Sequence, residues 1–212
     1  MTQTMATQKF STLRTQLQSS PPSQVPQKSC NSSKGTSVLL EITSYDDIDT
    51  RKLMDLYVEG NIENADDFYP DMANKSAALA LVEEGFLNFL KTDFFVRPNS
   101  TYYILEEDGT WVSALRLSLV ESDECRRYYM EALETRPCFR RKGYASKLLE
   151  EVIATLNHKG PFILCDCVSK HNEPSLKTHL KCGFQIASNE GFDYLQNEVD
   201  HHCYGLEYRF IP

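Results

Sequence analysis

The chain has 212 residues, of which 41% are hydrophobic and 25% charged, and its formal net charge is −8 at pH 7. This length and composition predict one globular domain with an appendage, and the acidic balance argues against nucleic acid as the main partner. No apolar run approaches the roughly 18 residues that a membrane helix needs, so no membrane partner is expected. The seven cysteines lack the regular spacing of a secreted disulfide framework, which favours a reducing, cytoplasmic compartment.

Residues 1–37 are predicted to form a disordered N-terminal extension, and residues 38–212 the folded domain. The extension contains no Asp or Glu and is rich in Ser, Thr and Gln. Such a stretch cannot bury enough apolar surface to offset the entropy lost on ordering. An acid-free, Ser- and Thr-rich start is also typical of an organelle transit peptide, although Arg14 is its only arginine and no amphipathic stripe is evident. The role of this extension is left open.

The folded domain is predicted to begin with a strand and two helices. Residues 38–42 read as the strand, and a helix follows over 51–57, for which Ser44 or Asp46 offers an N-cap. The second helix covers 79–89, because four apolar residues recur on one face, namely Leu79, Val82, Phe86 and Phe89.

Between these helices lies an acidic segment, residues 59–71, in which Phe68 and Tyr69 stand beside five acids. A surface formed by these acidic and aromatic side chains would attract a cationic amine. A solvated helix face followed by a turn explains the same pattern. The acids are Glu59, Glu63, Asp66, Asp67 and Asp71.

A hairpin is predicted next, with strands over 102–106 and 111–119. Asp108 and Gly109 form a strong two-residue turn signal between them. A further strand over 127–135 follows a polar turn.

A basic turn over residues 140–146 links that strand to the best helical pattern in the chain. From Ala145 the helix has an apolar stripe of Leu148, Leu149, Val152, Ile153 and Leu156. A strand, a short turn and a helix make an anion site, since the first helical amides lack intrahelical partners and lie at the positive end of the dipole. Gly143 has no Cβ, so a phosphate can come close to the backbone. The alternative is a solvated first turn that happens to be basic, at a small cost against the helix dipole.

The last part of the chain adds a buried strand over 162–168, a helix that Asn172 would cap, and strands over 183–188 and 204–210. The whole order predicts an α/β (α+β) fold with a mixed, largely antiparallel central sheet and helices on both faces.

Two segments of this chain resemble one enzyme family. Arg140-x-x-Gly143-x-Ala145 is similar to the Q/R-x-x-G-x-G/A acyl-CoA motif of the GNAT superfamily of N-acetyltransferases. The segment from Asn172 to Phe184 resembles the family's N-x-x-A-x-x-x-Y-x-x-x-G-F pattern and starts 32 residues after Arg140. The segments stand in the right order with a strand between them, and the resemblance covers residues 38–212. It implies a GNAT-like fold, acetyl-CoA as co-substrate, and direct transfer of acetyl to a primary amine in a ternary complex.

The resemblance also implies how the carrier is held. Amides of the turn would cradle the pyrophosphate, and Arg140 would add a charged contact. The strand before the turn would splay, so that its backbone pairs with the pantetheine arm as a ligand pairs with an open strand edge. The expected carrier-binding residues are Leu133, Thr135, Arg140, Arg141, Lys142, Gly143, Tyr144, Ala145, Ser146 and Asn172.

Deprotonating the amine is expected to fall to Glu131 or to Glu134, which an odd spacing places on opposite faces of a regular strand. Glu131 would share its face with Leu133. We chose Glu131, although the family places its strand carboxylate two residues earlier, where Tyr129 stands. A structural carboxylate, or a water chain doing the same work, is the alternative.

The clearest departure from the family is His179, which stands where a tyrosine commonly serves as general acid. An imidazolium, with a pKa near ~6.5, can protonate a thiolate whose own pKa is near ~8.5. Alternatively, His179 only packs beside Leu176 and Leu180. Asn172 has two explanations as well, carrier contact and plain N-cap.

Two other functions are open at this stage. A GNAT-like domain that binds acyl-CoA without turnover, as a sensor or scaffold, is the first rival. A metal or thiol module is weaker, because Cys165 and Cys167 lie on one strand face and the C-x2-C zinc spacing is absent. We therefore expect no metal and a small-molecule amine as acceptor. The oligomeric state is left open, with a homodimer as one option.

Overall fold

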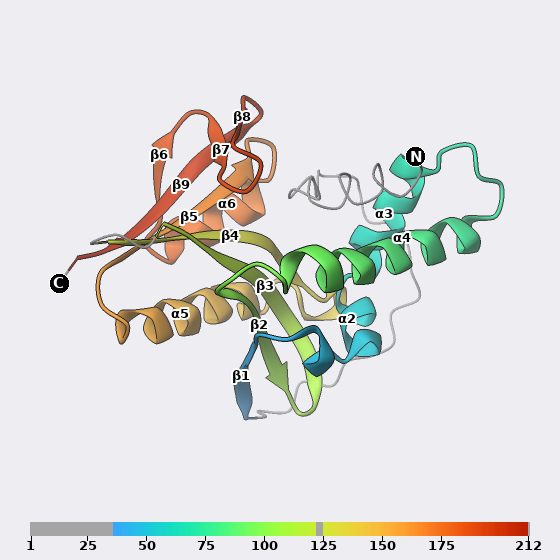
Figure 1. The fold of residues 1–212 in the computed structure, drawn as a ribbon, viewed down its shortest axis with the longest axis horizontal. Coiled ribbons are helices and arrows are strands. Elements are labelled where there is room, and N and C mark those ends of the chain that lie inside the picture. Colours follow the sequence, from blue (N-terminus) through green and yellow to red (C-terminus); the bar gives the residue numbers. More distant parts are fainter. Residues whose placement is uncertain (1–35, 122–124, 212) are drawn as a thin grey trace.

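The computed structural model describes residues 36–121 and 125–211, and the prediction of a disordered extension falls almost entirely outside these ranges. A seven-stranded sheet in the order β1-β2-β3-β4-β5-β9-β6 forms the middle layer, with helices on both faces (Figure 1). The predicted fold class is therefore confirmed.

The first four strands pair antiparallel in chain order: β1 (Ser37–Ile42), β2 (Ser100–Glu107), β3 (Thr110–Glu121) and β4 (Arg126–Thr135). Asp108 and Gly109 join β2 to β3 with φ angles of 48° and 76°. Positive φ at both central residues is the geometry of a type I′ hairpin turn, so the predicted hairpin is confirmed.

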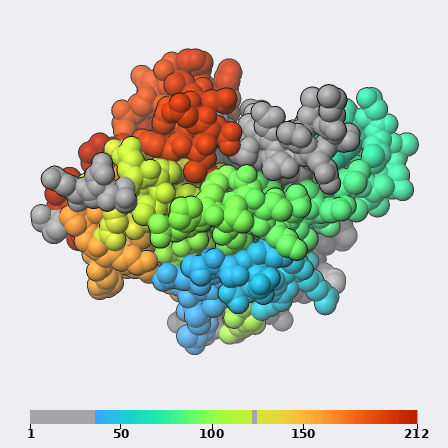
Figure 2. Space-filling view, in the orientation of Figure 1, coloured from blue at the N-terminus to red at the C-terminus, as the bar shows by residue number. Residues whose placement is uncertain are grey.

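The remaining strands of the sheet are β5 (Phe162–Ser169), β9 (Cys203–Phe210) and β6 (Gln185–Ser188). β5 runs parallel to β4, whereas β9 runs antiparallel to both β5 and β6. A separate hairpin of β7 (Gly191–Asp193) and β8 (Glu198–Asp200), which the sequence did not predict, lies beside β5 and β9. Figure 2 shows this C-terminal unit in red, above the green and yellow central residues.

The helices divide between the two faces of the sheet. One face carries η1 (Tyr45–Asp47), α2 (Thr50–Leu56), α3 (Val58–Phe68), α4 (Lys75–Phe89) and the π-helix η2 (Leu90–Phe94); the other carries α5 (Tyr144–Asn157) and α6 (Glu173–Lys181). The predicted N-cap of α2 was wrong. Asp49 caps it through Lys52 N at 3.0 Å, whereas Ser44 caps the preceding turn η1.

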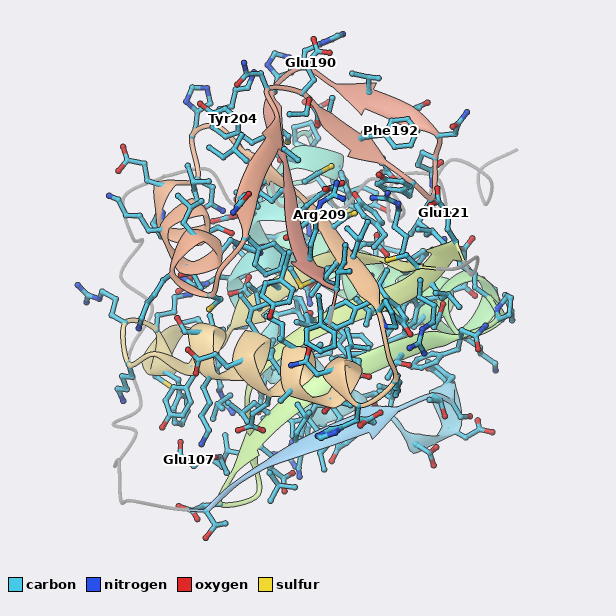
Figure 3. The ribbon with its side chains drawn as sticks, turned by 90° about the vertical axis from the view of Figure 1, so that its left-hand side faces the viewer. Glu107, Glu121, Glu190, Phe192, Tyr204 and Arg209 are labelled. Atoms are coloured by element: carbon cyan, nitrogen blue, oxygen red, sulfur yellow. The ribbon has the colours of Figure 1, made fainter. Side chains whose placement is uncertain are left out.

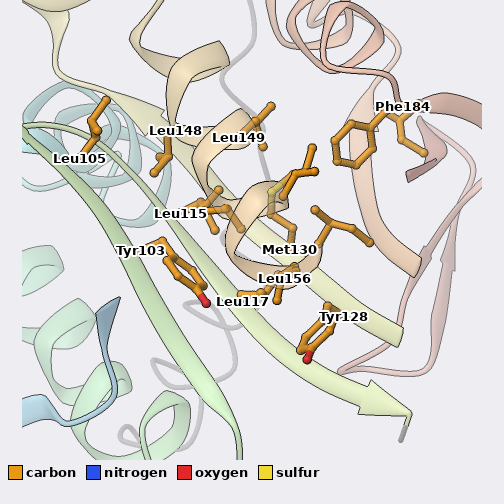
Figure 4. Close-up of a cluster of buried hydrophobic side chains, with 14 of the residues drawn as sticks. Tyr103, Leu105, Leu115, Leu117, Tyr128, Met130, Leu148, Leu149, Leu156 and Phe184 are labelled. Carbon is orange, nitrogen blue, oxygen red and sulfur yellow. The ribbon is translucent and has the colours of Figure 1, made fainter. Parts of the chain in front are cut away.

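The apolar stripe of α5 is buried as predicted, against side chains of β2 to β5 (Figure 4). Each leucine or valine buried in this way contributes about 2 kcal/mol. Figure 3 shows α5 lying across the sheet, with Glu107 below it and Glu190 above it. This packing fixes the N-terminus of α5 next to the end of β4. Among the described residues, no helix is both long and apolar enough to cross a membrane.

Candidate active site

Strands β4 and β5 pair along only part of their length. Their register runs from Arg126 opposite Phe162 to Tyr129 opposite Cys165 and ends there. We call the opening beyond this point the wedge; its sides are residues 130–135 of β4 and 166–169 of β5. The expected splay of the strands is therefore present.

A β-bulge explains the splay. Glu131 faces Arg116 and Glu134 faces Ala114, so Leu115 alone on β3 lies opposite two residues of β4. The first of these two, Ala132, has a φ of 53°. A bulge of this kind bends its strand and increases the local twist, and it turns β4 away from β5.

The bulge also corrects the prediction of which residues share a face. Because it adds one residue, Leu133 packs in the core on the α5 side, whereas Ala132 packs on the α2–α4 side. Glu131 and Glu134 both lie near the buried Tyr102 of the α2–α4 core. The prediction that the two glutamates face opposite ways, and that Glu131 shares a face with Leu133, was therefore wrong.

The basic turn next to the wedge presents an open row of backbone amides. In the hydrogen bonds of the described residues, none of the amides from Arg141 to Ser146 has an acceptor. Arg141 and Gly143 have φ angles of 61° and 87°. A Cβ on Gly143 would meet nothing within 4 Å, so the left-handed backbone, and not crowding, requires glycine. Consecutive free amides at a helix N-terminus are suited to an anion.

The other side chains of this turn lie at its surface or are engaged elsewhere. Arg141 and Lys142 are exposed, and Lys142 Nζ lies 5.1 Å from the ring centre of Phe139. Tyr144 donates to Glu107 through its hydroxyl. The turn therefore offers backbone amides together with two solvated positive charges.

Arg140 points away from the turn and into the wedge. Its Nε donates to Thr135 O at 3.0 Å, and its Nη2 lies 3.2 Å from Glu134 Oε1. Its Nη1 forms an ion pair with Glu59 Oε2 at 2.5 Å. The guanidinium thus ties the start of α3 to the end of β4.

Glu134 uses the same oxygen a second time. Its Oε1 accepts the backbone amide of Thr135 at 2.8 Å, and the residue is 6% exposed. Burial raises the pKa of Glu134 to about 7, against the opposing effect of Arg140. Sequence reasoning named Glu134 only as an alternative base and did not foresee its contact with Thr135.

On the opposite side of the wedge, Asp166 forms a matching arrangement. Its Oδ1 accepts the amide of Cys167 at 2.7 Å, and its Oδ2 lies 2.9 Å from Nε2 of His179. His179 is fully buried, and its Nδ1 lies 2.8 Å from the carbonyl oxygen of Ser175. Because a carbonyl only accepts, the contact with Ser175 requires a proton on Nδ1, and Nε2 lies at ion-pair distance from the Asp166 carboxylate. Burial raises the pKa of Asp166.

Asn172 caps α6, since its Oδ1 accepts Ser175 N at 3.1 Å. Its Nδ2 has no acceptor among the described residues. The predicted N-cap is confirmed, and one end of the amide is left for another contact. Whether that contact is the carrier stays a prediction.

Glu131 lies on the α2–α4 side and faces a buried arginine. Its Oε1 is 3.6 Å from Nη2 of Arg116, which is 1% exposed. Three aromatic rings surround the Arg116 guanidinium, with centres 5.0 to 5.9 Å away: Phe86, Phe89 and Phe94. Burial raises the pKa of Glu131, and the charge of Arg116 opposes this shift. Sequence reasoning missed Arg116, for which the available signal was a charge inside an otherwise apolar strand.

Most of the acidic segment becomes helix α3, whose start is tied to the end of β4 through Arg140. Glu59 is bound to Arg140, and burial raises the pKa of Glu63. The hydroxyl of Tyr57 donates to Ala132 O at 2.9 Å and accepts from Tyr102 at 2.7 Å. The bulge is therefore held from the α2–α4 side.

A hollow of about 170 Å³ lies under the β7–β8 hairpin, where Cys165, Tyr194 and Glu207 contribute to its lining. Arg127 Nη1 donates to all three, at 3.0 to 3.3 Å. Burial raises the pKa of the Cys165 thiol. In the described part of the chain, no cluster of three or more His, Cys, Asp or Glu side chains has the geometry of a metal site.

Comparison with known proteins agrees with this architecture. The family model for the acetyltransferase (GNAT) family matches residues 62–184. The fold is similar to that of the PaiA N-acetyltransferase from Thermoplasma acidophilum in complex with coenzyme A, with a TM-score of 0.57, 15% identity, and 82% of this chain and 99% of that chain covered. It is also similar to a GNAT-family acetyltransferase from Streptococcus pneumoniae, with a TM-score of 0.53, 16% identity, and coverage of 82% and 100%.

The IAA acetyltransferase from Bacillus cereus gives a TM-score of 0.52 at 17% identity, with coverage of 82% and 100%. No curated protein sequence matches the chain significantly. The structural likeness establishes the fold, and the family model spans more than half of the chain. An open wedge beside a row of free amides, on this fold and under this family model, therefore identifies the chain as an acyltransferase that belongs to the acetyltransferase (GNAT) family.

Proposed function

We propose that this acyltransferase moves an acetyl group from acetyl-CoA to a primary amine, most naturally of a small molecule, by direct transfer in a ternary complex. The observation that carries the proposal is the continuity between the wedge and the amide row. One end offers backbone donors for a pyrophosphate, and the other offers a strand edge for an amide-bearing arm.

The edge of β4 points the right way for this role. Arg136 N donates to Val112 O at 2.9 Å, so alternate residues of β4 turn their polar groups toward β3. Thr135 has the other parity, and its amide and carbonyl meet Glu134 and Arg140 and not β3. The pantetheine arm of acetyl-CoA would pair with Leu133 and Thr135 while its pyrophosphate lies on the amides of residues 141–146. The PaiA structure, which has this fold, contains coenzyme A.

The amine would approach from the α2–α4 side, where negative side chains gather. Glu59, Glu63 and Glu131 lie there. This charge favours a cationic amine in solution and then requires that its proton be removed. A carboxylate with a raised pKa suits that step, and we assign it to Glu131, acting directly or through water.

The leaving thiolate needs a proton on the opposite side of the wedge. The nitrogen of the amine attacks the thioester carbonyl, the C–S bond breaks, and the sulfur leaves as thiolate. We propose that His179, whose Nε2 lies 2.9 Å from Asp166 Oδ2, supplies this proton. The products are then an amide and coenzyme A with a free thiol.

Transfer without a covalent enzyme intermediate is supported by the state of the nearby cysteines. Burial raises the pKa of Cys182, which disfavours the thiolate that a nucleophile needs. The thiol of Cys167 lies 3.2 Å from the carbonyl oxygen of Phe192 and faces the β7–β8 hairpin.

The test is calorimetric titration of acetyl-CoA into the wild-type protein and into Gly143→Glu, with Glu150→Gln, an exposed change on α5, as control. A carboxylate at position 143 should abolish binding, because it occupies and repels the phosphate site. Binding by the wild type and the control alone supports the proposal. Absence of binding by the folded wild type would overturn the proposal. Equal binding by the wild type and both variants would show that the amide row does not hold the pyrophosphate.

A panel of amines then tests the reaction, with coenzyme A release followed by a thiol reagent. Turnover of small amines supports the proposed acceptor class. Turnover of peptide N-termini alone would replace it with a protein acceptor.

A further inference from the structure

The edge of β4 that should receive the pantetheine arm is already occupied by side chains of this chain. Thr135 N donates to Glu134 at 2.8 Å, and Thr135 O accepts from Arg140 at 3.0 Å. Glu134 and Arg140 also bind each other at 3.2 Å. One ion pair therefore caps both polar groups of the residue expected to pair with the carrier.

An amide N–H makes one good hydrogen bond, so Thr135 N cannot bind Glu134 and a ligand carbonyl together. The carbonyl of Thr135 can accept twice, and Arg140 need not leave. The competition is thus confined to one oxygen of Glu134.

We infer that the Glu134 carboxylate is a placeholder on the β4 edge, which the pantetheine arm of acyl-CoA must displace in order to pair with Thr135. The inference rests on the proposed function and adds a group that competes with the carrier. Glu134 remains tied to Arg140, and through it to Glu59, so displacement moves the carboxylate without leaving it isolated.

The arrangement is unfavourable to the fold by itself, which supports a role in binding. Glu134 is 6% exposed, and burial raises its pKa to about 7. A solvent-facing or apolar side chain at this position would avoid that cost. Groups held at such a cost gather at functional sites.

The experiment compares acetyl-CoA affinity in the wild type, Glu134→Ala and Glu134→Gln by calorimetry. Alanine removes the competing oxygen, so acetyl-CoA should bind about fivefold more tightly, the worth of one net hydrogen bond. Glutamine keeps an acceptor for Thr135 N without the charge and should gain less. The control variant Glu150→Gln removes one exposed negative charge from α5 and measures how much of any gain is purely electrostatic.

A second ligand separates competition from a general change at the site. Adenosine diphosphate presents a pyrophosphate without the pantetheine arm, so its affinity should be the same in the wild type and in Glu134→Ala. Tighter binding of acetyl-CoA alone establishes the placeholder. Unchanged or weaker acetyl-CoA binding in a folded Glu134→Ala overturns it, and so does an equal gain for both ligands.

The two proposals fail in different ways. If the wild type binds no acetyl-CoA, the proposed function fails. If the wild type binds and Glu134→Ala does not bind more tightly, only the placeholder fails.

Discussion

The two sides of the wedge carry the same local contact in different surroundings. On each side an acid accepts the amide of the next residue, Glu134 from Thr135 and Asp166 from Cys167. The partner of Glu134 is Arg140, whose side chain is 37% exposed, whereas the partner of Asp166 is His179, whose side chain is fully buried. One member of the β4 pair, Arg140, is therefore partly solvated, whereas both members of the β5 pair are buried.

The difference assigns separate tasks to the two sides. A carboxylate held by a partly solvated arginine can be exchanged for a ligand carbonyl at modest cost. A carboxylate paired with a buried imidazole is fixed in position, and we propose that it serves the reaction only through that imidazole. The two basic motif residues, Arg140 and His179, each support the acid of the neighbouring strand edge.

Removing the β5 acid should have the largest effect. Asp166→Ala leaves the imidazole of His179 and the amide of Cys167 without partners, and we expect it to lower the free energy of unfolding by about 3 kcal/mol. Urea denaturation measures this. Asp166→Asn should recover most of the loss, because its Nδ2 can donate to Nε2 of His179.

Asp71→Ala, an exposed substitution, is the control for this series. A loss in Asp166→Ala no larger than that of the control would show that the two sides of the wedge do not differ in the way described.

On the β4 side, removing the charge of Glu134 should favour the folded state as pH rises, whereas removing Asp166 disfavours it. The pKa of Glu134 is raised from 4.5 to about 7, so the stabilisation it gives is complete below pH 4.5 and is lost as pH rises to about 7. The shift corresponds to about 3 kcal/mol. Glu134→Gln does not titrate, so its stability relative to the wild type should rise by that amount over this range. Urea denaturation at pH 4.5 and pH 8 measures it, and a constant difference between the two proteins would contradict the raised pKa.

The proposed role of His179 on the β5 side is tested by turnover. His179→Phe keeps the contact with the Phe184 ring but removes the proton, and we expect kcat to fall about a hundredfold while the Kd for acetyl-CoA stays within about twofold. His202→Phe, on the surface, should leave both unchanged. An unaltered kcat in His179→Phe would reduce the pair to a structural role.

The smallest expected effect concerns the turn that joins the two sides to the phosphate site. Gly143 has a φ of 87°, so Gly143→Ala should lower the free energy of unfolding by about 1 to 2 kcal/mol. Gly60→Ala, within helix α3 and with nothing close to the added Cβ, should instead stabilise by about 0.5 to 1 kcal/mol. Thermal melts of the two variants show whether each substitution raises or lowers stability. A change in the same direction for both would contradict the backbone explanation for Gly143.

Local patterns predicted much of this molecule. The apolar stripe of α5, the Asp108–Gly109 hairpin and the Asn172 cap depend on residues close in sequence, and the structure has all three. The three-residue strands β7 and β8 are too short to produce a periodic signal. The bulge at Ala132 depends on the register of β4 with β3, which the sequence of one strand does not contain.

The motifs named Arg140 and His179 as candidate site residues, but the partners of these side chains could not be foreseen. Arg140 finds Glu59 at a distance of 81 residues in sequence, and His179 finds Asp166 on another element. The direction of a charged side chain depends on its partners in the folded structure. The spacing of residues within a motif carries no information about those partners.

Amide hydrogen exchange with and without acetyl-CoA tests the central claim most directly. If the carrier spans the wedge and the turn, the amide of Leu133 and those of residues 141–146 should gain protection together, while β1 and β2 stay unchanged. Thr135 N already donates to Glu134 in the free protein, so its protection should change less. Protection of the turn alone would contradict the account, since it would leave an anion site with no carrier in the wedge.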